Sequence, residues 1–183
     1  YLLHFDIDKR NFTIVDVDGD GHKLQQYNRL LFCDSKKRIW AGGEMGISVF
    51  NQVGTSLLPN TDFQIASVLK QAFVNCFYET SSGYLWIGTR NGLFALKESD
   101  KQFLQYTTEN GLPSNVIYGI LEDAYGRLCI STNQGLSCLN SESGKFRNFT
   151  IMDGLQGNQF NAGAYCRKDN GYMLFGGVNG ITS

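Results

Sequence analysis

The chain has 183 residues, of which 42% are hydrophobic and 18% charged, with 16 Lys and Arg against 17 Asp and Glu. This length allows one ordinary domain with its own core, and the balanced charge gives no electrostatic reason to expect nucleic acid as a main partner. No run of apolar residues reaches the length of a membrane span. Because Tyr1 stands in mid-pattern, with no initiating Met or signal peptide, we interpret the chain as an excerpt of a longer protein.

The first chemical motif along the chain is acidic. Asp16, Asp18 and Asp20 occupy the first three carboxylate positions of an EF-hand calcium loop. The position of the bidentate Glu is held by Tyr27, and no helices are predicted on either side. We therefore interpret the motif as a solvated turn, keep calcium as the weaker alternative, and expect no cofactor.

One ten-residue segment recurs four times, at residues 38–47, 84–93, 127–136 and 172–181. In each copy a glycine lies six residues after one fixed position, giving the pairs Trp40–Gly46, Trp86–Gly92, Cys129–Gly135 and Leu174–Gly180. These glycines recur at intervals of 46, 43 and 45 residues. Such a fixed period indicates a repeat architecture.

Each complete period contains four strand candidates rich in alternating apolar and aromatic residues. They are expected at 73–79, 84–88, 92–97 and 102–107, and again at 115–122, 127–131, 135–140 and 145–150. Four short antiparallel strands per period are typical of a β-propeller blade. We predict an all-β chain, a β-propeller fragment with about four repeats of four-stranded antiparallel blades. The expected boundaries are 1–26, 27–69, 70–112, 113–156 and 157–183.

The first and last predicted blades are incomplete, which suggests how the chain assembles. Strands near 2–6 and 11–15 form the outer pair of one predicted blade, and strands near 159–166 and 172–176 form the inner pair of another. Incomplete blades expose unpaired backbone, so we expect self-association through open blade edges. The five Cys show no CxxC or zinc spacing, and most are interpreted as small buried hydrophobic residues.

The third repeat is similar to a known family. The residues Gly83-Tyr-Leu-Trp-Ile-Gly-Thr89, Gly92-Leu93, Phe103, Tyr106 and Asn110-Gly-Leu-Pro-Ser-Asn115 resemble the two-component-regulator propeller repeats of bacterial hybrid sensor histidine kinases. The resemblance implies a periplasmic sensor region that detects oligosaccharides and controls glycan-utilisation genes. Its kinase, receiver and DNA-binding parts would lie outside this chain, and only the parent protein would contact the membrane or nucleic acid.

A ligand site is expected where polar side chains gather on loops. If strands alternate in direction, the connector entering each blade and the turn between its second and third strands share one face. That face would collect polar and aromatic candidates, although each amide taken alone can be a simple turn former. The candidates are Glu44, Arg90, Asn91, Asn115, Tyr118, Asn133, Gln134, Asn158 and Asn179.

No catalytic arrangement is signalled, so we expect a non-enzymatic sensor. The sequence contains neither a Ser-His-Asp motif nor a phosphate-binding loop, and both histidines lie near the amino end. A propeller of a different class remains the alternative, namely a structural or dimerisation scaffold that binds no ligand. A propeller-fold lyase or glycosidase is the third and weakest interpretation.

Overall fold

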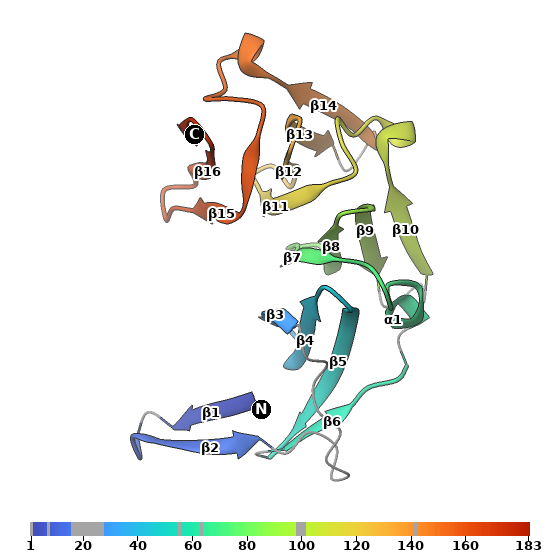
Figure 1. Ribbon diagram of the computed structural model, residues 1–183, viewed down its shortest axis with the longest axis vertical. Helices are drawn as coiled ribbons and strands as arrows, with labels where there is room; N and C mark the ends of the chain where they lie inside the picture. Colours follow the sequence, from blue (N-terminus) through green and yellow to red (C-terminus); the bar gives the residue numbers. More distant parts are fainter. Residues whose placement is uncertain are drawn as a thin grey trace. The chain divides into compact units, whose positions relative to one another are not determined.

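The computed structural model describes residues 2–6, 8–15, 28–54, 56–62, 64–97, 102–140 and 143–183. The chain divides into two compact units, Tyr1–Ala72 and Phe73–Ser183. Nearly all regular structure in both is antiparallel β-sheet in which successive strands are neighbours (Figure 1). Within the described residues, no helix has the length and apolar character required to cross a membrane.

The first unit contains a two-stranded and a four-stranded sheet. The hairpin consists of β1 (Leu2–Asp6) and β2 (Asn11–Val15), as the sequence predicts. The four-stranded sheet consists of β3 (Asn28–Cys33), β4 (Arg38–Gly43), β5 (Gly46–Val53) and β6 (Ser56–Pro59). A short helix that the sequence analysis did not anticipate, α1 (Gln64–Val68), follows this sheet.

The second unit contains two complete four-stranded sheets and one of three strands. The first comprises β7 (Val74–Glu79), β8 (Tyr84–Thr89), β9 (Gly92–Lys97) and β10 (Gln102–Tyr106). The second comprises β11 (Ile117–Glu122), β12 (Leu128–Thr132), β13 (Gly135–Asn140) and β14 (Lys145–Phe149). The third comprises β15 (Phe160–Arg167), β16 (Met173–Gly177) and β17 (Gly180–Thr182).

These bounds correct the expectations at the carboxyl end. The predicted strands 159–166 and 172–176 each lie one residue further along, and a third strand joins the expected pair. The connectors before β11 and β15 contain short 3₁₀ helices, η2 (Thr108–Asn110) and η3 (Ile151–Asp153), which the sequence analysis left as irregular chain.

In the second unit the first strands of the sheets are neighbours, and β11 contacts both β7 and β15. A buried side-chain bond joins two of them, since Asn75 Nδ2 donates to the Ile117 carbonyl at 2.7 Å. Gly119 is packed so closely against the Tyr165 ring that a Cβ there would clash with it. These strands therefore fix the sheets side by side, which positions the loops at the sheet ends.

Two apolar clusters occupy the spaces between these sheets. The first includes Trp86 and Ala95 together with Ile117 and Ile130 of the next sheet. The second includes Cys129 together with Phe160 and Phe175 of the last sheet. Each of the two complete sheets in this unit thus buries one face against its successor, as expected of propeller blades.

Candidate functional site

The turn between the second and third strands of each complete sheet in the second unit is held by a threonine hydroxyl. Thr89 Oγ1 donates to the Gly92 carbonyl at 2.8 Å and accepts from the Asn91 amide at 2.9 Å. Thr132 makes the same pair of bonds in the next sheet. Its Oγ1 donates to the Gly135 carbonyl at 2.8 Å and accepts from the Gln134 amide at 3.0 Å. Because Thr89 and Thr132 are fully buried, these turns are fixed platforms for the residues that they carry.

Each of these turns is also bonded to the connector that leads to the next sheet. The Gly92 amide donates to the Asn115 carbonyl at 2.8 Å, and the Gly135 amide donates to the Asn158 carbonyl at 2.6 Å. The geometry therefore brings two pairs of candidates together, Asn91 with Asn115 and Gln134 with Asn158. Turns and connectors lie at the same end of the sheets, as the alternation of strand direction requires.

The side chains of Asn115 and Asn158 already have a structural task. Asn115 Oδ1 accepts from the Thr108 amide at 2.8 Å, and Asn158 Oδ1 accepts from the Ile151 amide at 2.9 Å. In both connectors this bond satisfies a free backbone donor at the start of a 3₁₀ helix. Their oxygens are thus committed to holding the connector, a role that the sequence analysis did not foresee.

The rest of the connector motif is explained by helix capping. Thr107 accepts from the Glu109 amide at 3.3 Å, while Asn110 Oδ1 accepts from the Thr107 amide at 2.8 Å, forming a capping box. Gly111 then ends the helix with a φ of 105°, a conformation that glycine adopts without strain. The same arrangement recurs at residues 150–154.

Arg90 is a candidate that is both exposed to solvent and packed on an aromatic ring. Its guanidinium carbon lies 3.7 Å from the centre of the Phe73 ring, and its backbone amide donates to the Phe73 carbonyl at 3.0 Å. The side chain is exposed. Stacking restricts the guanidinium plane while leaving its edge available for bidentate hydrogen bonds.

Three further candidates in the second unit have mixed surroundings. Asn133 Oδ1 is buried, and within the described part of the chain it has no hydrogen-bond partner. Asn179 is exposed, and its backbone amide donates to Gln156 Oε1 at 2.8 Å. Tyr118 is half-buried and packs against the cluster that contains Phe160, so part of its ring is already covered.

Glu44 lies in the first unit, in the turn between β4 and β5. Its Oε1 pairs with Arg29 Nη2 at 3.2 Å, and the side chains of Glu44 and Arg29 are 37% and 67% exposed. Exposed pairs of this kind contribute little to stability. Among the candidates, Glu44 is thus one whose carboxylate is already paired with a cation of its own unit.

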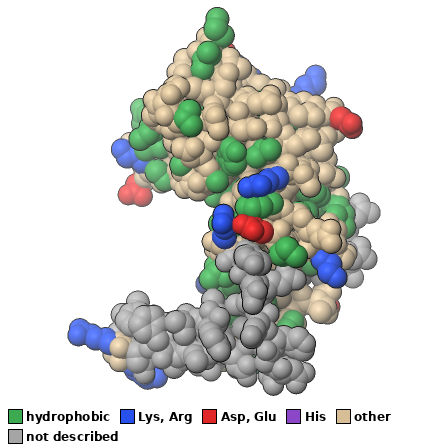
Figure 2. All heavy atoms as spheres, in the orientation of Figure 1, with side chains coloured by type: hydrophobic (Ala, Val, Ile, Leu, Met, Phe, Trp, Pro, Cys, Tyr) green, Lys and Arg blue, Asp and Glu red, His purple; other side chains and the backbone are tan. Residues whose placement is uncertain are grey.

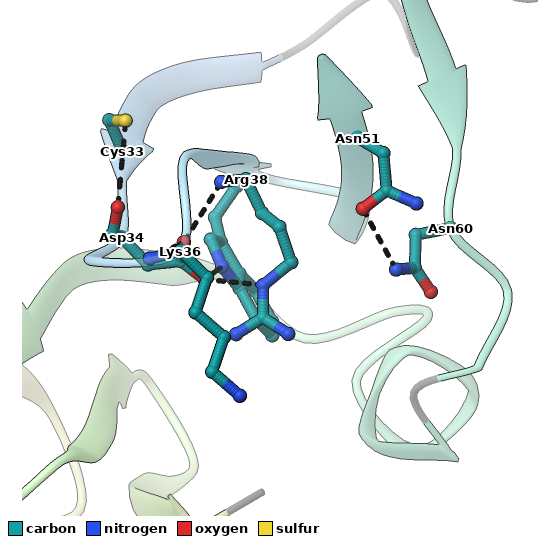
Figure 3. A network of polar contacts seen from close by, with 7 residues as sticks. Cys33, Asp34, Lys36, Arg38, Asn51 and Asn60 are labelled. Atoms are coloured by element: carbon teal, nitrogen blue, oxygen red, sulfur yellow. Dashed lines mark hydrogen bonds and ion pairs between the residues drawn. The ribbon is translucent and has the colours of Figure 1, made fainter. Parts of the chain in front are cut away.

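At the other end of the sheets, sequence reasoning missed an aspartate clasp. Asp34 accepts four hydrogen bonds, from the Lys36 and Arg38 amides at 3.0 and 2.9 Å, from Arg38 Nε at 2.6 Å and from Trp40 Nε1 at 2.8 Å (Figure 3). Burial alone would raise the pKa of Asp34, but the bonds from Trp40 and Arg38 and the Arg38 charge outweigh it and lower that pKa. The clasp therefore holds an ionised carboxylate in the turn between β3 and β4.

A similar clasp without the indole bond recurs at the turn between β11 and β12, where Asp123 also accepts from the Tyr125 and Arg127 amides at 2.8 and 2.9 Å, and the clasp is altered in β7–β10. Asp123 Oδ2 accepts from Arg127 Nε at 2.6 Å, and although burial opposes it, these hydrogen bonds and the Arg127 charge lower the pKa of Asp123. Thr80 occupies the corresponding position beside Trp86. The indole N–H of Trp86 is buried and has no partner among the described residues. The Asp-x-x-x-Arg spacing was the signal that could have revealed the clasp.

The cysteines differ from expectation. Cys129 and Cys138 form a disulfide, and of the three free cysteines only Cys76 is buried, whereas Cys33 and Cys166 are exposed. The interpretation of most cysteines as small buried hydrophobic residues is therefore wrong. Burial raises the pKa of the Cys76 thiol to about 12, so this thiol is neutral at physiological pH and is not a ready nucleophile.

The calcium alternative at Asp16, Asp18 and Asp20 lies outside the described residues. Among the residues that the structure does describe, no three His, Cys, Asp or Glu side chains gather in a group that could hold a metal ion.

Comparisons with known proteins agree with this architecture. Residues 69–91 match the model of the two component regulator propeller family. The chain is 28% identical over 189 aligned residues to "Histidine kinase P4" of Formosa agariphila, an alignment that covers 99% of this chain and 14% of that protein. The chain therefore spans about a seventh of the length of this curated relative.

Solved structures show the same fold. The extracellular domain of the putative hybrid two component system BT3049 from B. thetaiotaomicron superposes with a TM-score of 0.78 at 24% identity, covering 93% of this chain and 23% of that one. The extracellular domain of the putative one component system BT4673 from the same organism gives a TM-score of 0.76 at 18% identity, covering 98% and 24%. The predicted β-propeller fold is confirmed. The residues that match the two component regulator propeller family, 69–91, include strands β7 and β8 of one of these sheets.

Proposed function

We propose that this chain is part of the extracytoplasmic sensor region of a hybrid two-component histidine kinase. The supporting observation is the alignment of nearly the whole chain with a histidine kinase, together with the structural likeness to extracellular domains of such systems. In this proposal the kinase lies elsewhere in the parent protein, and the propeller blades themselves perform no catalysis. The location is periplasmic, with the membrane reached only through the parent.

The signal in this proposal is an oligosaccharide that leads to control of glycan-utilisation genes. Amide and guanidinium groups on fixed loops suit sugar hydroxyls, which both donate and accept hydrogen bonds. Arg90 is stacked and exposed, and Gln134 is exposed on a turn held by Thr132. A ligand that binds one arrangement of the sensor better than another would shift the population across the membrane.

The test is a thermal-shift screen of the complete extracytoplasmic region against an oligosaccharide panel, followed by calorimetry on any hit. A ligand that binds only the folded state must raise the melting temperature. Arg90→Ala and Gln134→Ala should then weaken binding, and Gln134→Ala, on an exposed side chain, should do so without changing the unliganded melting temperature. Tyr125→Ala is the matched control, because Tyr125 is 85% exposed but lies in a turn at the other end of its sheet. A well-folded region that responds to no glycan class would contradict the proposal.

The rival function is a structural or dimerisation scaffold, and exposed apolar side chains at η3 favour it. Met152 is 89% exposed and Ile151 54% exposed, and Figure 2 shows hydrophobic side chains projecting where η3 lies. In this alternative, copies associate through such surfaces and through open blade edges. Sedimentation of wild type and Ile151→Ser/Met152→Ser would distinguish the two, because only a scaffold built on η3 loses its self-association.

A further inference from the structure

The disulfide occupies the position that tryptophan holds in the two preceding sheets. Trp40 pairs with Val49 across β4 and β5, and Trp86 pairs with Ala95 across β8 and β9. In β12 and β13 the corresponding pair is Cys129 with Cys138, whose Cα atoms lie 4.3 Å apart. A cross-strand cystine thus takes the place of a large residue opposite a small one.

The Trp86–Ala95 pair and the Cys129–Cys138 pair each pack against the following sheet. Trp86 and Ala95 belong to the cluster formed with β11–β13, which includes Ile117, Leu128 and Ile130. The disulfide belongs to the cluster formed with the last sheet, in which Cys129 is 5% exposed. The Trp86–Ala95 pair and the disulfide therefore occupy equivalent positions in two successive interfaces between sheets of one unit.

The residues that face the two pairs differ in size in a consistent way. Phe160 stands where Ile117 does, since each lies opposite the residue three places before the turn glycine. By the same register, Phe175 replaces Ile130 and Met173 replaces Leu128. The Phe160 and Phe175 rings meet edge to face, with centroids 6.3 Å apart. Three positions that are aliphatic opposite the tryptophan are thus longer or aromatic opposite the disulfide.

The larger residues opposite the disulfide follow from the close packing of protein interiors. A cystine is much smaller than an indole, and a protein interior does not leave such a volume empty. Phe160, Phe175 and Met173 supply the missing volume from the other side of the interface. We propose that the Cys129–Cys138 disulfide replaces the interblade tryptophan and is matched to this enlarged set, so that the seating of β15–β17 on β11–β14 depends on the oxidised cystine.

The redox step is a simple exchange. Two thiolates of one dithiothreitol molecule attack in turn, the Cys129–Cys138 bond breaks, and dithiothreitol closes into its cyclic disulfide. The protein gains two electrons and two protons as two thiols. Removing the cross-link over a sequence separation of nine residues frees the unfolded chain, and the melting temperature should fall by roughly 5–10 °C.

The first experiment compares thermal unfolding of the full chain with and without dithiothreitol. Thiol titration in denaturant should count three free thiols before reduction, from Cys33, Cys76 and Cys166, and five afterwards. The control is Cys129→Val/Cys138→Val, whose melting temperature should not respond to dithiothreitol. Five thiols before reduction, a wild type that melts equally in both states, or a control that shifts as much as wild type would each overturn the proposal.

A second experiment tests the matching itself. Cys129→Trp/Cys138→Ala transplants the preceding pair and should melt below the Cys129→Val/Cys138→Val control, which also lacks the cross-link, because the indole overfills a space bounded by phenylalanines. Adding Phe160→Ile and Phe175→Ile should recover most of the difference from this control, whereas these two changes alone should lower the melting temperature of the wild type. Additive losses in the four-residue variant would refute the matching. If the transplanted pair prevents folding, amide hydrogen exchange of β15 and β16 is measured in the wild type before and after reduction. Faster exchange after reduction would support the proposal, and unchanged exchange would refute it.

Discussion

Replacing Asp34 by Asn should destabilise the first unit by about 2–4 kcal/mol. The amide keeps one oxygen, which can continue to accept from the Lys36 and Arg38 amides. Its NH₂ group then faces Arg38 Nε and Trp40 Nε1, two donors that previously shared one carboxylate oxygen. Trp40 is fully buried and the Arg38 side chain is 14% exposed. Each buried donor left without an acceptor costs about 1–3 kcal/mol.

Urea unfolding followed by Trp40 fluorescence measures this loss, in a Trp86→Phe background that leaves one tryptophan in the chain. Asp123→Asn is the matched control, read through Trp86 in a Trp40→Phe background. Its Arg127 partner is 53% exposed, so the loss should be about 1 kcal/mol or less. Equal losses at the two aspartates, or a loss at Asp34 below about 0.5 kcal/mol, would refute the reasoning.

The same clasp sets a pH dependence. Although burial opposes ionisation, the hydrogen bonds and the Arg38 charge place the folded-state pKa of Asp34 below its usual value. A depressed pKa contributes stability that is present above the unfolded pKa of about 3.9 and is lost as the pH falls through the folded pKa. The stability difference between wild type and Asp34→Asn should therefore be full at pH 7 and shrink as the pH drops below about 4. A difference that stays constant over this range would contradict the assignment.

Three further variants test the other features of the sheets. Thr80→Asp/Tyr84→Arg supplies the missing clasp beside Trp86 and should raise the free energy of unfolding by about 1–2 kcal/mol, measured with urea; a decrease would show that the indole N–H is out of reach of the new carboxylate. Asn115→Ala removes the acceptor of a helix-start amide and should cost about 1 kcal/mol, whereas Gln134→Ala, on an exposed side chain, should change stability by less than about 0.5 kcal/mol. Equal losses for these two alanine variants would remove the distinction between connector and presented residues.

Much of the fold could be predicted because the period is visible in single residues. Gly92 and Gly135 mark turns of positive φ that fix the pairing of the strands on either side. The short helix α1 could not be predicted in this way, because residues 57–69 depart from the repeat and only tertiary packing decides their conformation. Strand β17 was missed because its three residues are too few to show an alternation.

The candidate site was less predictable, since a polar residue in a loop can either hold the loop or face solvent. Asn115 and Arg90 look equally available in the sequence, yet Asn115 caps a helix while Arg90 lies exposed on Phe73. The disulfide, by contrast, could have been predicted from the spacing of its two cysteines around a turn. Cys129 and Cys138 are equally distant from the turn at residues 133–134, so a tight hairpin must place them opposite each other.

The bonds from turn glycines to connector carbonyls have a consequence for how such proteins can be divided. The Gly92 and Gly135 amides donate to Asn115 and Asn158, which belong to the entrance of the following sheet. In both cases the turn amide lies in one repeat and its carbonyl acceptor in the next. A repeat that is excised at the end of its sheet therefore loses the acceptor that its turn amide requires. A shortened version of the protein should end after the connector asparagine, and duplication of one repeat should include the same residue.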